Sequence, residues 1–168
     1  QQQDAIAVKI ISALLKERRL QIRLRFSYPT GDWADMGNNF TNDDKHQCFI
    51  ISKNKSTALI EHKLDTAVYY VSAAWNDNAI IKEKMKHYFT IVPDAANSFE
   101  CSFRFDEKKN TATPSFTITE NNSIQQWKQF WQSGAAVDFS GSTDTRAFEL
   151  ERRIVLSQYL TKIQCACD

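Results

Sequence analysis

The sequence Leu-Gln-Ile-Arg-Leu-Arg-Phe-Ser at residues 20–27 alternates apolar and polar side chains. A period of two places the apolar side chains on one face of an extended strand and the polar ones on the other. An apolar run at residues 8–15 precedes it across residues 16–19, a polar stretch of hairpin length. The pattern therefore predicts two antiparallel strands, 8–15 and 20–27, that share a buried face.

Further strand-like runs fill the first two-thirds of the chain. They lie at residues 47–53, 57–63, 67–75, 84–92, 99–105 and, more weakly, 115–119. Turn-forming residues at 53–56 and at Asp65 separate some of them, and residues 76–84 fit either a helical turn or a bulged strand start. About eight short strands at this spacing indicate an antiparallel β-sandwich.

The hydrophobic period changes after Glu120. Apolar side chains between residues 124 and 131 recur three and four positions apart behind Ser123, a candidate N-cap, which predicts a helix. Gly134 and residues 138–142 then interrupt the helical pattern. The predicted fold class is therefore mainly β: an antiparallel, supersandwich-like β-sandwich followed by two C-terminal α-helices.

The second helix is predicted at residues 145–163, with Thr143 or Asp144 as its cap. Its apolar residues cover well over half of the helix circumference. A helix with so wide an apolar surface requires neighbours on several sides. We therefore expect it to belong to a larger helical body, and the chain to be a fragment of a longer protein.

Composition narrows the classes of function. The 168 residues are 42% hydrophobic and 24% charged, which is typical of a globular domain. The formal net charge is +1, with both signs interspersed, so a nucleic-acid partner is not expected. No apolar run approaches the roughly 20 residues of a membrane-spanning helix, so we expect no membrane partner.

Sequence motifs indicate neither a catalytic nucleophile nor a cofactor. The chain has no Gly-x-Ser-x-Gly elbow and no glycine-rich phosphate loop. The cysteines, at positions 48, 101, 165 and 167, have no disulfide-framework spacing and are interpreted as buried or incidental thiols. His46, His62 and His87 show no ligand-pair spacing, so we expect satisfied surface or core histidines and no metal site.

Residues 28–46 form a long segment without hydrophobic periodicity. Loops of this length are usually functional. Within it, Tyr28 and Trp33 offer rings that can stack on sugar C–H faces, and the Asp32 carboxylate can accept hydrogen bonds from sugar hydroxyls. These three residues are the predicted carbohydrate-binding residues. The alternative is that the aromatic side chains simply anchor the loop.

Several stretches together resemble a known family. They are residues 25–31, His46, residues 64–70, residues 87–89, Trp127 to Trp131 and, most strongly, residues 146–160. The chain resembles the front portion of bacterial six-hairpin glycosidases related to glycoside hydrolase family 65. In that family an N-terminal β-sandwich is joined by a helical linker to an (α/α)6 barrel. Glu-Leu-Glu-Arg-Arg at residues 149–153 looks like the start of the first barrel helix.

The resemblance implies a β-sandwich at residues 1–120, a helical linker at 121–142 and the first helix of a truncated catalytic barrel at 143–168. The whole protein would hydrolyse glycosidic bonds, with its catalytic acid in the missing barrel and therefore no catalytic residue here. The implied partners are a carbohydrate and that barrel. The cellular compartment stays open, with the periplasm or the exterior of a bacterium among the options. Two alternatives stay open: a stand-alone carbohydrate-binding module, and an oligomerisation domain that forms a homodimer through the apolar helix.

Overall fold

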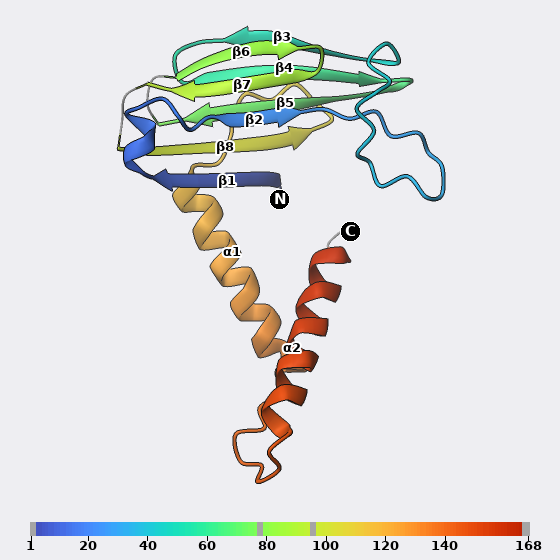
Figure 1. Ribbon diagram of the computed structural model, residues 1–168, viewed down its shortest axis with the longest axis vertical. Helices are drawn as coiled ribbons and strands as arrows, with labels where there is room; N and C mark the ends of the chain where they lie inside the picture. The colour runs from blue at the N-terminus through green and yellow to red at the C-terminus, as the bar shows by residue number, and fades with distance from the viewer. Residues whose placement is uncertain (1–2, 77–78, 95–96, 166–168) are drawn as a thin grey trace. The chain divides into compact units, whose positions relative to one another are not determined.

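The computed structural model describes residues 3–76, 79–94 and 97–165 (Figure 1). Its elements in chain order are β1 (Asp4–Ile11), a 3-10 turn (Ala13–Leu15), β2 (Ile22–Arg25), β3 (His46–Lys53), β4 (Thr57–Leu64), β5 (Ala67–Trp75), β6 (Ala79–Met85), β7 (Tyr88–Pro93), β8 (Ser98–Asp106), α1 (Phe116–Phe130), a π-helical segment (Trp131–Ala135) and α2 (Ala147–Gln164). The chain divides into two compact units, residues 1–120 and 121–168. The predicted fold class, mainly β with two C-terminal helices, is confirmed.

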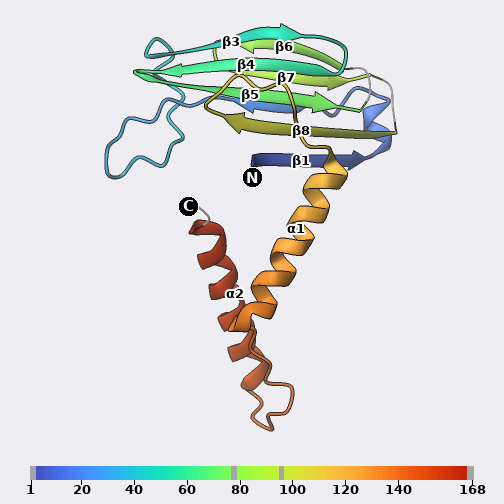
Figure 2. The ribbon, with the colours of Figure 1, turned by 180° about the vertical axis from the view of Figure 1, so that it is seen from behind.

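Two antiparallel sheets build the first unit. One sheet has five strands in the order β1-β8-β5-β4-β3, and the other has three strands in the order β2-β7-β6. Figure 2 shows the strands of both sheets lying along nearly the same axis, which is the arrangement of an aligned sandwich.

The hydrophobic core lies between the two sheets. Ile60 and Val71 come from the five-stranded sheet, Phe89 and Ile91 come from the three-stranded sheet, and all four side chains are fully buried in one cluster. Burial of each such side chain contributes about 1.5–3 kcal/mol. The sandwich is therefore closed by apolar contact between residues far apart in the sequence.

The predicted pairing of residues 8–15 with 20–27 is wrong. β1 pairs with β8 in one sheet, and β2 pairs with β7 in the other. Residues 13–15 form a 3-10 turn whose Leu15 side chain enters the core, so the segment between the strands crosses from sheet to sheet. β8 is the better partner for β1 because its alternating apolar residues meet those of β1, as in the pairs Ile6 with Phe103 and Val8 with Cys101.

The predicted strand at residues 84–92 is also wrong, because it is two strands. β6 and β7 form a hairpin whose turn contains His87 in the left-handed region, at φ 60°. Of the two readings of residues 76–84, the bulged strand is correct from Ala79 onward, with a register shift between Glu83 and Met85. Residues 77 and 78 lie outside the described residues.

The first helix begins earlier than predicted. Residues 116–119, the larger part of the weak strand predicted at 115–119, are the first turn of α1. Ser115 rather than Ser123 supplies the capping oxygen, because its Oγ accepts a hydrogen bond from Ile118 N at 3.3 Å. The residues on both sides of the predicted 120/121 boundary therefore share one helix.

The second unit contains most of α1 and all of α2. Gly134, inside the π-helical segment, has φ 110°, a conformation that residues with a Cβ rarely adopt, and so confirms the interruption predicted there. Trp127 of α1 stacks on Tyr159 of α2 with ring centroids 5.1 Å apart. Within the described part of the chain, neither helix combines the length and apolar character that a membrane crossing needs.

Candidate functional site

The long loop, residues 28–45, carries the three predicted carbohydrate-binding residues, but they do not form one surface. Trp33 is fully exposed, and among the described residues no ring contact or hydrogen bond joins it to Tyr28 or Asp32. The Asp32 carboxylate accepts a hydrogen bond from Thr30 Oγ1 at 3.2 Å. The indole of Trp33 is therefore free to stack on a ligand, whereas Asp32 takes part in the internal hydrogen bonding of the loop.

Tyr28 is anchored to the sandwich. Its hydroxyl donates to the Asp65 carboxylate, with both oxygens at 3.2 Å, and its half-buried ring lies 5.8 Å from the ring of His46. Burial, followed by the hydrogen bond to Asp65, raises the pKa of Tyr28 above its usual value. This matches the alternative that aromatic side chains hold the loop in place.

Asp35 organises the tip of the loop. Its carboxylate accepts hydrogen bonds from Thr30 N, from Thr30 Oγ1 at 2.8 Å and from Gly37 N at 2.8 Å. These bonds, first of all the one from the Thr30 backbone, lower the pKa of Asp35. The loop therefore has defined internal structure that can present Trp33.

A pocket of about 320 Å³ lies where the base of the loop meets the sandwich. It is lined mainly by apolar groups, including Phe26, Pro29, Leu64, Tyr69 and Phe105. None of the three predicted carbohydrate-binding residues lines it. Sequence reasoning thus identified the loop but not the pocket at its base.

The structure brings together three histidines that the sequence keeps apart. His46 and His62, on adjacent strands β3 and β4, place Nδ1 and Nε2 2.8 Å from each other. The ring of His87, from the β6–β7 turn, stacks on that of His46 with centroids 3.7 Å apart. All three residues are buried, and we call them the histidine cluster.

The surroundings of the cluster give two further ring nitrogens a hydrogen-bond partner. His62 Nδ1 lies 2.7 Å from the hydroxyl of Tyr69 on β5. His87 Nε2 lies 2.8 Å from the backbone carbonyl oxygen of Asp43, so this nitrogen carries the proton and donates it. The second nitrogen of a neutral His87, Nδ1, then carries a lone pair, and that atom is buried without a hydrogen-bond partner.

Burial favours the neutral form of His46 and of His62. Burial, followed by the proximity of the other two imidazoles, lowers the pKa of His62 to about 4, and burial also lowers the pKa of His46. Burial raises the pKa of the neighbouring Cys48 thiol to about 12 and that of the Tyr69 hydroxyl to about 12. At neutral pH the His62, His46, Cys48 and Tyr69 side chains therefore form a set of uncharged donors and acceptors.

The turn that carries His87 is tied to the long loop. Lys86 Nζ contacts Asp44 Oδ1 at 2.6 Å, next to the bond between His87 and the Asp43 carbonyl. The ion pair lowers the pKa of Asp44, chiefly through the Lys86 hydrogen bond. The cluster thus joins elements of both sheets and the end of the loop.

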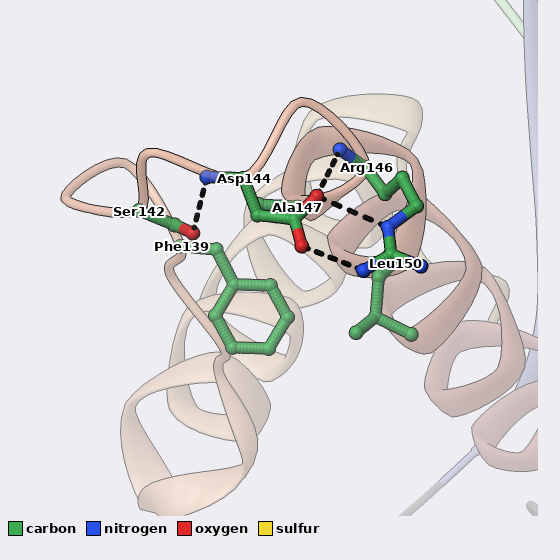
Figure 3. A pocket seen from close by; sticks show the side chains of 6 residues that line it. All are labelled: Phe139, Ser142, Asp144, Arg146, Ala147 and Leu150. Atoms are coloured by element: carbon green, nitrogen blue, oxygen red, sulfur yellow. Dashed lines mark hydrogen bonds and ion pairs between the residues drawn. The ribbon is translucent and has the colours of Figure 1, made fainter.

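The second unit has a pocket of its own, of about 510 Å³, at the start of α2 (Figure 3). Phe139, Ala147 and Leu150 give it apolar walls. Its polar groups are engaged with one another, because the Asp144 carboxylate binds the Arg146 guanidinium at 2.8 and 3.1 Å. Asp144 also accepts a bond from Arg146 N at 2.8 Å, but the predicted cap at Thr143 or Asp144 is wrong, because the N-cap of α2 is Arg146 and no side chain caps the helix there.

The sequence contained one signal for the cluster. His46 and Cys48 are two residues apart, a spacing that places them on one face of a strand, although the predicted strand began only at residue 47. The contribution of His62 depends on the β3–β4 register, and that of His87 depends on the packing of the two sheets. Neither could be read from residue spacing.

Comparison with protein-family models, with curated proteins and with solved structures finds no match to this chain. The assignment of function therefore depends on the residues and their geometry.

Proposed function

We propose that this chain is a non-catalytic, N-terminal portion of a bacterial glycoside hydrolase. In this proposal the β-sandwich and the helical unit support a catalytic (α/α)6 barrel in the same protein, and the long loop reaches the rim of its active site. The resemblance of residues 146–160 to the start of such a barrel suggests the family. The exposed apolar surface of α2 carries the structural argument.

α2 has 18 residues, and none of them is buried. Tyr159 stacks on Trp127, so this side of α2 faces α1. Leu150, nine positions before Tyr159, lies about two and a half turns away and so on the opposite side of the helix. Large exposed apolar side chains occur along the whole of α2: Phe148, Leu150, Leu156, Tyr159, Leu160 and Ile163.

A surface of this kind favours burial against further protein. Protein packed against the side of α2 that carries Leu150 would remove these side chains from water. Each such side chain contributes about 1.5–3 kcal/mol of stabilising free energy when fully buried. A barrel of paired helices is the neighbour that the resemblance implies. This is the support for a role in holding a larger helical body.

The edge of the sandwich supports the same proposal. Ile6 and Val8 of β1 face Phe103 and Cys101 of β8 across the strand pair, so they belong to the inner face of the five-stranded sheet. Phe103 and Cys101 are buried, whereas Ile6 is 57% exposed. The three-stranded sheet therefore leaves this inner edge uncovered, and additional protein would complete it.

A carbohydrate-binding module is the second candidate, and Trp33 favours it. A fully exposed indole on a loop with defined internal bonds is a typical platform for stacking on a sugar ring. This candidate requires no additional barrel. It assigns function to the loop rather than to α2.

Two measurements on the whole 168-residue chain separate these functions. Sedimentation velocity over a range of dilutions measures self-association, and calorimetric titration with oligosaccharides measures binding. A support role predicts a weakly associating or monomeric chain that does not bind oligosaccharides by itself. Saturable sugar binding would instead establish a module, and a dimer that persists on dilution would establish an oligomerisation domain; either result overturns the proposal.

Trp33→Ala tests the role of the loop in the intact enzyme. We expect KM to rise roughly 3- to 10-fold, because the variant loses one ring contact of about 0.5–1.5 kcal/mol. Thermal stability should stay unchanged, because Trp33 packs against nothing in the described structure. Met36→Ala, at another exposed position of the same loop, is the matched control and should leave KM unchanged. Equal KM values for both variants and wild type would remove the loop from substrate recognition.

A further inference from the structure

The histidine cluster lies beside a buried thiol. His46 and Cys48 are two residues apart on β3, and Cys48 is directly opposite His62 in the antiparallel pair of β3 with β4. The four residues are almost completely buried, with relative exposures of 3% for His46, 6% for Cys48, 1% for His62 and 6% for His87. β3 and β4 therefore place two imidazoles and one thiol side by side in the interior.

The spacing of the three groups suits a single metal ion. One ligand atom each from His46, Cys48 and His62 lie within 4.8 Å of one another. His46 Nδ1 and His62 Nε2 are 2.8 Å apart, and two nitrogens bound tetrahedrally to zinc at about 2.0–2.1 Å are separated by roughly 3.3 Å. Small side-chain adjustments are thus enough to place an ion between them.

His62 Nδ1 and His87 Nε2 have hydrogen-bond partners of the kind found in metal-binding histidines. Such residues donate the N–H that does not face the metal to a carbonyl, a carboxylate or another polar group, which fixes the tautomer. His62 Nδ1 is paired with the Tyr69 hydroxyl, and His87 Nε2 donates to the Asp43 carbonyl. The Asp43 carbonyl makes His87 Nδ1 a lone-pair nitrogen, and His62 Nε2 is one as well when His62 Nδ1 donates to the Tyr69 hydroxyl.

A purely structural hydrogen-bonded core explains His46 and His62 but does not explain His87. The bond between His46 and His62 satisfies one nitrogen of each ring. His87 Nδ1 is buried with no partner among the described residues, although an unsatisfied buried acceptor is unfavourable. A bound metal ion that accepts this lone pair would remove the unfavourable free energy of the unsatisfied acceptor.

We propose that His46, Cys48 and His62 form a site for one zinc-type divalent ion, and that His87, whose ring stacks on His46, moves its unpartnered Nδ1 to the ion and so fastens the β3–β4 hairpin to the β6–β7 turn. Two or three imidazoles and one thiolate are a ligand set that favours zinc. Binding forms the metal–nitrogen and metal–sulfur bonds, and the Cys48 thiol releases its proton to solvent. The proton in the bond between His46 and His62 moves to the other nitrogen of the ring that carries it. No oxidation or reduction takes place.

Cobalt(II) provides a direct test on the whole chain, because its absorption reports both thiolate ligation and tetrahedral geometry. The chain is first treated with a chelator and then titrated with Co²⁺, followed by displacement with Zn²⁺. We expect saturation at one ion per chain, a thiolate-to-cobalt charge-transfer band and intense visible d–d bands, all abolished by Zn²⁺. Absence of saturable binding would overturn the proposal.

Matched cysteine variants identify the ligand. Cys48→Ser should abolish the charge-transfer band and weaken Zn²⁺ binding by more than about 100-fold, whereas Cys101→Ser, at another buried thiol, should leave both unchanged. His87→Gln should also weaken binding. Tyr69→Phe, which removes the partner of His62 Nδ1, should weaken Zn²⁺ binding by about 10- to 100-fold.

Circular dichroism without metal confirms that each variant is folded before its affinity is compared. A charge-transfer band that survives in Cys48→Ser would place the metal elsewhere and overturn the assignment. If Cys48→Ser does not fold, the Zn²⁺ affinities of Tyr69→Phe and His87→Gln test the site instead. Unchanged Zn²⁺ affinity in both of these variants would equally overturn the site.

Discussion

Replacing Phe89 with alanine is expected to lower the free energy of unfolding by about 3–5 kcal/mol. Phe89 lies on β7, is fully buried, and meets Phe26 edge to face with ring centroids 5.9 Å apart. Its side chain belongs to the cluster that joins the two sheets, so its removal leaves a cavity at their interface. Equilibrium unfolding in urea, followed by fluorescence, measures the change in the midpoint.

Phe49→Ala is the matched control for Phe89→Ala. Phe49 is also a phenylalanine on a strand, β3, but its side chain is 49% exposed and contacts the Lys63 ammonium at 5.8 Å from the ring centroid. We expect a loss below about 1 kcal/mol, as for most surface substitutions. Equal losses in both variants would contradict the position of the core between the two sheets.

The strands were predictable from local pattern, and their partners were not. The predicted strand at residues 67–75 coincides with β5, and the run at 99–105 lies inside β8, because alternation marks a half-buried strand without reference to its neighbours. Pairing depends on which apolar faces meet in three dimensions. The hairpin predicted from residues 8–15 failed for this reason, since β1 pairs with β8 in one sheet and β2 pairs with β7 in the other.

The β6–β7 turn was missed for a different reason. Short hairpins are usually signalled by glycine or asparagine at positive φ. Here the residue at φ 60° is His87, preceded by Lys86, so the composition of residues 84–92 reads as one strand. The same residue is held by the Asp43 carbonyl and by the ring of His46, which are tertiary contacts.

The candidate sites differ in how far the sequence could reveal them. The loop with Trp33 was recognisable because length and aromatic content are local properties. The structure, however, separates its predicted residues: Tyr28 contacts Asp65, whereas Trp33 faces solvent. The histidine cluster needed the β3–β4 register and the packing of the two sheets, neither of which is encoded in residue spacing.

Ser157→Pro is expected to unfold the middle of α2 while the β-sandwich stays folded. Ser157 is an exposed residue near the middle of this 18-residue helix, and proline there removes one backbone hydrogen bond and clashes with the carbonyl of Arg153. The cost is about 3 kcal/mol, and no residue of α2 is buried to offset it. Far-ultraviolet circular dichroism should show loss of helix.

Peptide-resolved hydrogen exchange locates the effect of Ser157→Pro. We expect amides of α2 to lose protection and amides of β4, β5 and β8 to keep it, because residues 1–120 form a compact unit with its own core. Ser157→Ala is the matched control and should keep or slightly strengthen the helix, since alanine is the best helix former. If the strands lost protection together with α2, the two units would unfold as one cooperative body, and α2 would stabilise the sandwich itself rather than offer its apolar surface to further protein.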